Sequence, residues 1–165
     1  MNFNYTEEQN ALRDMIKTFT AKEILPHAEY YDRTEEFPYE TWKKLANLGV
    51  VNMTLPEEAG GLGADMLSQC LVIEEIGYAD SSYAPIFSAQ LSSSRHLLRY
   101  ARQAHRTEWI EKYVKPIAGG LAFGATGLTE PNSSSSDAAS MKTTAVRDGD
   151  EWVINGNKMY STASG

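Results

Sequence analysis

The chain has 165 residues, of which 42% are hydrophobic and 22% are charged, and its formal net charge is −7. This composition is typical of a globular protein, and the length suits one domain, or one domain and part of another. Because the charge is negative and no Lys/Arg cluster occurs, we expect no nucleic-acid partner. No stretch predicts a membrane span, and the first residues resemble neither a signal nor a transit peptide, which predicts a cytoplasmic protein.

Helical patterns occupy residues 6 to about 116. Thr6 and Gln9 fit a capping box, in which each side chain bonds the backbone N–H of the other residue. Apolar residues at helical spacing follow this box and predict the first helix. Pro26 should break that helix or begin the next one.

Four further helices are expected after this point. Pro38 should begin one that ends before Gly49, since glycine is common just past a helix end. A glycine-rich loop follows, and Asp65 is expected to cap the helix after it. Later helical patterns run from about 83 to 100 and from 106 to 114.

The helix after Asp65 contains the single cysteine of the chain, Cys70, inside an apolar run. A buried structural thiol is therefore expected, because free cysteine packs as a small apolar residue. Glu74 and Glu75 are expected on the polar face of the same helix. One cysteine and three histidines without ligand spacing predict no metal site.

From Leu121 onward the pattern changes to short segments that predict strands. Asp148-Gly149-Asp150 and Asn155-Gly156 are both typical of hairpin turns. The segments with strand character are residues 121–128, 141–146, 151–154 and 158–162.

Helices in one block and strands in the next predict an α+β chain. We expect an all-α helical bundle over residues 1–118 and the first strands of an antiparallel β-domain over residues 119–165. A sheet of so few strands has open edges and half a core, so this β-domain is expected to be truncated.

Two segments could carry chemistry. The first, residues 124–131, ends in a Thr-Glu-Pro corner and enters the Ser-rich run 133–136. Hydroxyl and backbone N–H groups of such a loop can hold phosphate oxygens, although a surface loop without a ligand is an equal alternative. The second, residues 158–162, offers a tyrosine and two hydroxyls that could pack against a planar ring. An ordinary amphipathic strand is the alternative.

The order of the motifs along nearly the whole chain resembles that of acyl-CoA dehydrogenases. The matching pieces are Tyr5-Thr6-Glu7-Glu8-Gln9, Leu55-Pro56-Glu57-Glu58, Gly60-Gly61-Leu62-Gly63, Glu74-Glu75-Ile76, Leu128-Thr129-Glu130-Pro131, Met141-Lys142-Thr143 and Asp148-Gly149-Asp150 through Lys158-Met159. The resemblance implies a helical amino-terminal domain, a β-domain and a carboxy-terminal helical domain that is absent here. It also implies FAD as cofactor and an acyl-CoA substrate that is desaturated by hydride transfer to FAD.

The resemblance places six residues along the flavin ring. The first three would follow its pyrimidine side through their backbone and the threonine hydroxyl, and the last three would pack on the ring, with the final threonine near N5. These residues are Thr126, Leu128, Thr129, Tyr160, Ser161 and Thr162.

A seventh residue, Ser136 next to Asp137, corresponds to the serine that contacts flavin phosphate and the CoA portion of the substrate. Ser135 is the alternative, because this loop lacks the glycines usual in the family and is one residue longer. Weakened or absent FAD binding is therefore the alternative expectation for this chain.

No catalytic residue is expected in the chain, because the resemblance places the catalytic base in the absent carboxy-terminal region. The isolated chain should therefore be inactive. Two alternatives are a non-catalytic truncated subunit or interaction module, and a fragment of a related acyl-CoA oxidase or flavin monooxygenase. Family members are homo-oligomers, but their assembly region is also absent here.

Overall fold

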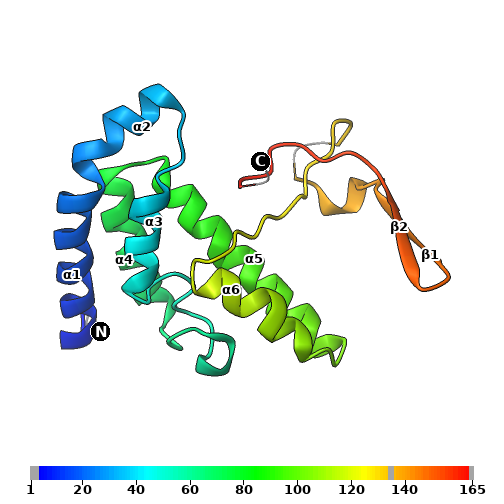
Figure 1. Cartoon of the computed structure of the whole chain (residues 1–165), viewed down its shortest axis with the longest axis horizontal. Coiled ribbons are helices and arrows are strands. Elements are labelled where there is room, and N and C mark those ends of the chain that lie inside the picture. Colours follow the sequence, from blue (N-terminus) through cyan, green and yellow to red (C-terminus); the bar gives the residue numbers. More distant parts are fainter. Residues whose placement is uncertain (1–3, 134–135, 164–165) are drawn as a thin grey trace. The chain divides into compact units, whose positions relative to one another are not determined.

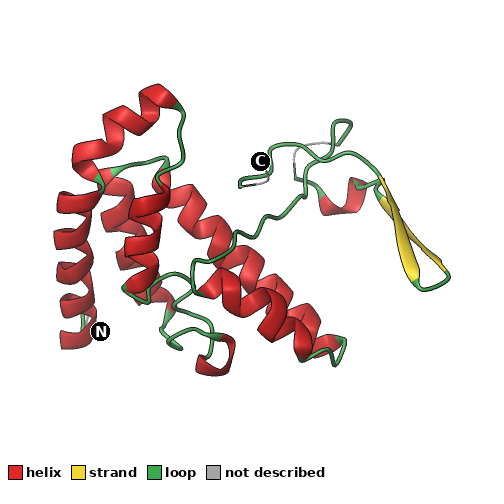
Figure 2. Ribbon diagram, in the orientation of Figure 1, coloured by secondary structure: helices red, strands yellow, loops and turns green. Residues whose placement is uncertain are grey.

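A computed structural model describes residues 4–133 and 136–163 of the chain. These residues divide into two compact units with the boundary between Gly124 and Ala125. The first unit is helical and the second contains a hairpin of two strands (Figures 1 and 2). Within the described ranges, no helix is both long enough and apolar enough to cross a membrane.

Helix α1 (Glu7–Glu23) begins at the expected capping box. The Gln9 N–H donates to Thr6 Oγ1 at 3.1 Å, and the Thr6 N–H donates to Gln9 Oε1 at 3.0 Å. A 3₁₀ turn at Leu25–His27 contains Pro26 and separates α1 from α2 (Ala28–Thr34), which confirms the predicted interruption.

The expected boundaries of the next two helices are also confirmed. Helix α3 (Tyr39–Asn47) begins directly after Pro38, and Gly49 lies just past its end with a φ of 75°. Helix α4 (Met66–Ala79) is capped by Asp65, whose carboxylate accepts a hydrogen bond from the Ser68 N–H at 2.6 Å.

Helix α5 (Tyr83–Gln103) is the longest element, and a π-helical turn (Ile110–Val114) then leads into α6 (Lys115–Ala118). The helical pattern predicted over residues 106–114 is therefore confirmed as helix from residue 108, but part of it is a π-helical turn and the helix continues to Ala118. Pro116 explains the wider turn, because it has no N–H to donate to residue 112 and its ring crowds that carbonyl. The Lys115 N–H instead bonds the Ile110 carbonyl.

Most of the core of the helical unit lies among α1, α3, α4 and α5. Trp42, Phe87 and Leu45 are each at most 1% exposed. The remaining buried members of this cluster are Ile16, Ile24, Val50, Val51, Met53, Val72, Ile76, Ala79, Tyr83 and Leu91.

Two expectations for helix α4 are wrong. Cys70 is exposed, so the expectation of a buried thiol is wrong. Glu75 is only 6% exposed, so its expected place on the polar face is also wrong. The helix lies between α1 and α5, and the face that carries Glu75 meets α1, where Arg13 Nε donates to the carboxylate at 2.8 Å. A buried carboxylate requires such a partner.

The second unit contains an antiparallel hairpin of β1 (Thr144–Asp148) and β2 (Glu151–Asn155). Val146 pairs with Val153 in its register. Gly149 supplies a φ of 60° at the turn, which confirms the turn predicted at residues 148–150.

The other predicted strands are absent from the described residues. Residues 121–128 and 158–162 form no strand, and Asn155-Gly156 is not a hairpin turn. Tyr160 and Ala163 have φ values of 57° and 60°, which interrupt extended backbone. Residues 158–162, which were predicted as a strand, are therefore an irregular segment.

Candidate functional site

The two segments predicted to carry chemistry lie side by side in the second unit. The Met159 N–H donates to the Thr129 carbonyl at 3.0 Å, and Ser161 Oγ donates to the Thr126 carbonyl at 2.9 Å. Lys158 Nζ donates to the Leu128 carbonyl at 3.1 Å. The two segments therefore run in opposite directions, and among the described residues a single backbone–backbone bond takes the place of a regular ladder.

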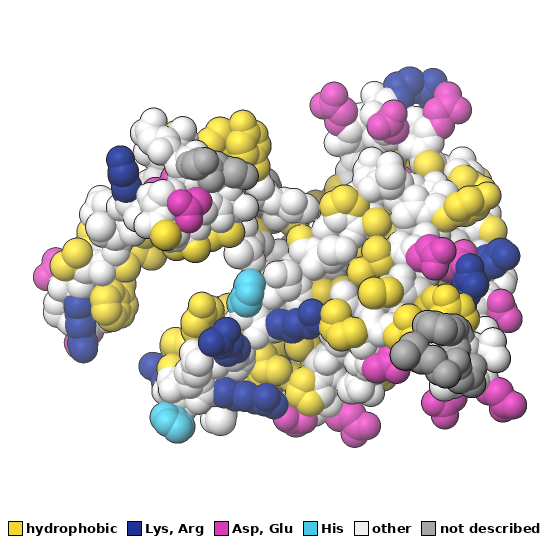
Figure 3. Space-filling view, turned by 180° about the vertical axis from the view of Figure 1, so that it is seen from behind, with side chains coloured by type: hydrophobic (Ala, Val, Ile, Leu, Met, Phe, Trp, Pro, Cys, Tyr) yellow, Lys and Arg dark blue, Asp and Glu magenta, His cyan; other side chains and the backbone are white. Residues whose placement is uncertain are grey.

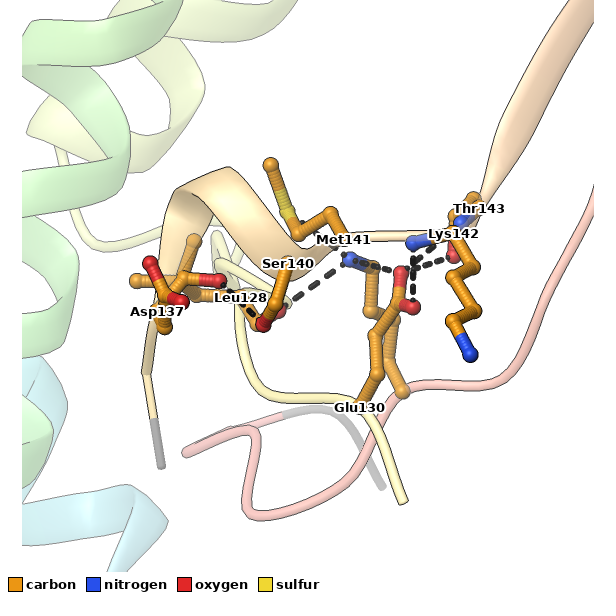
Figure 4. Close-up of polar contacts among 8 residues, drawn as sticks. Leu128, Glu130, Asp137, Ser140, Met141, Lys142 and Thr143 are labelled. Atoms are coloured by element: carbon orange, nitrogen blue, oxygen red, sulfur yellow. Dashed lines mark hydrogen bonds and ion pairs between the residues drawn. The ribbon is translucent and has the colours of Figure 1, made fainter. Parts of the chain in front are cut away.

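Glu130 connects this segment pair to the start of the hairpin. Its carboxylate accepts hydrogen bonds from the Lys142 N–H at 2.7 Å, from the Thr143 N–H at 3.0 Å and from the Thr143 hydroxyl. Lys158 Nζ completes the set at 2.9 Å. Figure 4 shows the Glu130 carboxylate pointing toward Lys142 and Thr143, where the chain enters β1.

These donors change the acidity of Glu130. The Thr143 hydroxyl, the Lys142 and Thr143 N–H groups and the Lys158 ammonium all favour the charged form and together lower its pKa to about 2. The side chain is 8% exposed, so water supplies little of its solvation. Glu130 is therefore an anion held by protein donors, and it fixes the Thr-Glu-Pro corner.

Gly156 is part of the same arrangement. A Cβ atom at this residue would lie 2.1 Å from Thr143 Oγ1, so only glycine allows this close approach. The glycine that appeared to signal a turn instead keeps Thr143 in contact with Glu130.

The segment pair presents unused donors and an exposed ring. Among the described residues, no acceptor bonds the backbone N–H of Thr126 or Leu128, or the hydroxyl of Thr129. Tyr160 is 85% exposed, and its backbone has a positive φ. Thr162 is exposed beside it. Such an arrangement can hold a planar ring that has acceptors along one edge.

Ser136 is exposed, and no hydrogen bond within the described part of the chain links it to the other six predicted residues. The next residue, Asp137, caps a 3₁₀ turn (Ala138–Ser140) by accepting from the Ala139 N–H at 3.0 Å. The alternative, Ser135, lies outside the described residues.

The residues that support the site were missed by reasoning from the sequence. Glu130, Lys142 and Lys158 were recognised only as parts of motifs, without a role. One signal was available: a glutamate between a threonine and a proline at the end of an apolar segment requires donors if it becomes buried.

Comparison with known proteins identifies related chains. Residues 6–116 match the family described as "Acyl-CoA dehydrogenase, N-terminal domain". A probable acyl-CoA dehydrogenase of Bacillus subtilis is 43% identical over 98% of this chain and 42% of its own length. An acryloyl-CoA reductase (NADH) of Anaerotignum propionicum is 34% identical over 100% of this chain and 41% of its own. The chain thus spans about two fifths of the length of these relatives.

Solved structures agree with these relatives. A glutaryl-CoA dehydrogenase from Mycobacterium smegmatis, in complex with FADH2, is 30% identical, with a TM-score of 0.86 over 95% of this chain and 39% of that one. A glutaryl-coenzyme A dehydrogenase in complex with glutaryl-CoA is 31% identical, with a TM-score of 0.87 over 98% of this chain and 40% of that one.

Proposed function

The chain belongs to the acyl-CoA dehydrogenase family, and we propose that it supplies one wall of the flavin site in an enzyme that desaturates acyl-CoA thioesters. The observation that supports this proposal is the segment pair of residues 126–130 and 158–162, with its unused N–H donors and its exposed tyrosine. One relative of known structure is described in complex with FADH2 and another with glutaryl-CoA, which supports a flavin and a CoA thioester as the ligands.

The residues present fit a flavin. An isoalloxazine ring is planar and carries carbonyl and ring-nitrogen acceptors along its pyrimidine edge. The N–H groups of Thr126 and Leu128 and the hydroxyl of Thr129 have no acceptor among the described residues, so they would donate to that edge. Tyr160 and Thr162 would lie against the ring. Ser136 would contact phosphate oxygens of FAD or CoA.

The chain's own residues bind and orient, and none of them is proposed as a catalytic residue. When bound, FAD would supply the acceptor for the hydride that leaves the β-carbon of the acyl group. Glu130 and Lys158 would hold the segment pair in place without touching the ring. Turnover would also require a base that removes the α-proton, and we assign no carboxylate of this chain to that role.

Flavin retention tests the proposal directly. The purified chain is mixed with FAD, the excess is removed, and the visible absorption spectrum is recorded. We expect a retained flavin band with a perturbed shape. Thr129→Val removes one donor and should weaken retention about fivefold, the size of one net hydrogen bond. Thr144→Val, on the exposed strand β1, should retain FAD as the unsubstituted chain does. Equal retention by both variants would contradict the proposed contact.

A further inference from the structure

A groove of about 380 Å³ lies in the helical unit, between α5 and the loop at residues 54–56. Its apolar lining consists of Leu55, Pro56 and Leu98. No acidic residue is among the described residues that line it. The charged lining consists of three arginines: Arg95, Arg99 and Arg102. None of these residues belongs to the segment pair described above.

Helical spacing brings the three arginines together. They are four and three residues apart in the sequence, so they share one face of α5, with neighbouring Cβ atoms about 5–6 Å apart. Figure 3 shows Lys and Arg side chains gathered over α5, in the lower part of the view. Cations in the last turn of a helix offset its dipole, which accounts for Arg102. That effect does not extend to Arg95, which lies about two turns earlier.

Arg95 carries a charge that no acidic side chain compensates. It is half-buried, and its Nε and Nη2 atoms donate to Thr54 Oγ1 at 3.2 and 2.6 Å. Nη2 also donates to Gln69 Oε1 and to the Met66 sulfur. These acceptors are all neutral, and within the described part of the chain Arg95 forms no ion pair. Charges withdrawn from water are normally paired, so this fixed guanidinium calls for an anion.

A ligand in the groove can reach all three guanidiniums. The Nη1 group of Arg95 has no acceptor among the described residues, which leaves its N–H bonds available. Arg99 is exposed and has no ion pair in the same ranges. Arg102 donates to Glu58 at 2.6 Å, but the two side chains are 53% and 63% exposed. Exposed pairs contribute little to stability, so an anion can compete with Glu58 for Arg102.

The chemistry of the groove indicates the class of anion. The planar fork of a guanidinium matches the oxygens of a phosphate or a carboxylate. A phosphate monoester carries a charge of about −1.5 to −2 at pH 7 and three acceptor oxygens, so it can engage two guanidiniums at once. A single carboxylate offers less charge and only its two oxygens. The apolar lining suits an organic body attached to the phosphate.

We propose that this groove binds a small organic phosphate monoester. Arg95 and Arg99 hold the phosphate oxygens, and the apolar lining contacts the organic body. Arg102 adds a further donor when the anion displaces Glu58. This site shares no residue with the proposed flavin wall and does not depend on it.

Titration of the chain with three matched probes, followed by amide chemical shifts, tests this site. Phenyl phosphate carries the full charge, phenyl sulfate has the same shape with one negative charge, and inorganic phosphate lacks the ring. We expect saturable binding of phenyl phosphate, with shifts centred on α5 and residues 54–56. Phenyl sulfate should bind at least about tenfold more weakly, and inorganic phosphate about fivefold more weakly. No saturable binding of phenyl phosphate, or equal binding of any two probes, would overturn the proposal.

Three variants then assign the contacts. Arg99→Gln removes an exposed guanidinium that has no ion pair, and should weaken phenyl phosphate binding about tenfold. Arg33→Gln removes the same charge from an exposed position on α2 and should change nothing. Glu58→Gln frees Arg102 and should strengthen binding about two- to fivefold.

The comparison of these variants separates a specific site from general attraction. Equal weakening by Arg99→Gln and Arg33→Gln would show attraction to the net charge and refute the site. Binding to Glu58→Gln that is unchanged or weaker would refute the part assigned to Arg102.

Discussion

Replacing Gly156 by alanine tests how the Glu130 arrangement is built. The added Cβ would lie 2.1 Å from Thr143 Oγ1 and 2.6 Å from Thr143 Cβ. Non-bonded atoms approach to about 3.5 Å, so Thr143 must withdraw by roughly 1 Å or more. Overpacking of this kind costs about 1–3 kcal/mol. The displaced Thr143 would lose its bonds to Glu130.

Amide hydrogen exchange measures this cost where it arises. The Lys142 and Thr143 N–H groups both donate to Glu130, so their exchange reports local opening. A loss of 1–3 kcal/mol corresponds to exchange that is about five- to 150-fold faster. The matched control is Gly77→Ala on α4, where the new Cβ meets only Ala84 Cβ at 3.5 Å. That variant should leave both amides unchanged.

A double substitution decides whether Thr143 is the source of the cost. Thr143→Gly combined with Gly156→Ala removes the Oγ1, Cβ and Cγ2 atoms that the new Cβ would strike. The double variant should therefore be less destabilised than the sum of the two single variants, because contacting residues couple. Strictly additive effects would refute the clash as the mechanism.

Two further predictions concern other buried groups. Gln90→Leu removes two bonds that hold Gly124, from its N–H at 2.8 Å and to its carbonyl at 3.2 Å. Because two buried backbone groups lose their partners, the free energy of unfolding should fall by about 2–4 kcal/mol in urea denaturation, whereas exposed Gln103→Leu should change it little. The pKa of Glu130 is lowered from its ordinary 4.5 to about 2, so its contribution to stability is complete above pH 4.5 and is lost as the pH falls toward 2. The Lys142 amide shift should follow that titration, and a midpoint near 4.5 would contradict the structure.

Local patterns predicted the helical unit well because they act within a few residues. The Thr6 capping box, the Asp65 cap and the position of Gly49 each depend on backbone groups of one turn. The hairpin turn at Gly149 is equally local. These features follow from capping and turn preferences that need no distant partner.

The predictions that were wrong depend on contacts between residues that are far apart in the sequence. Whether Glu75 is buried depends on Arg13, which is 62 residues away in the sequence. The role of Gly156 depends on Thr143, and the exposure of Cys70 depends on which face of α4 meets α1. Spacing within one helix or strand cannot show these contacts. The sequence predicted the two segments of the site but not the role of Glu130 in holding them together. That role depends on hydrogen-bond donors that lie 12, 13 and 28 residues away in the sequence.

Replacing Tyr160 should affect the stability of this site and its proposed flavin binding in different ways. A tyrosine at a φ of 57° is strained by about 1 kcal/mol or more, and its ring is 85% exposed, so packing against the chain compensates little of that strain. Asparagine adopts this backbone region readily. Tyr160→Asn should therefore leave the stability of the second unit unchanged or raise it by up to about 1 kcal/mol, as measured by amide exchange. The same variant should retain less FAD, because the ring that would lie against the flavin is gone. A tyrosine that only packed against the protein would give the reverse, a loss of stability without a loss of flavin.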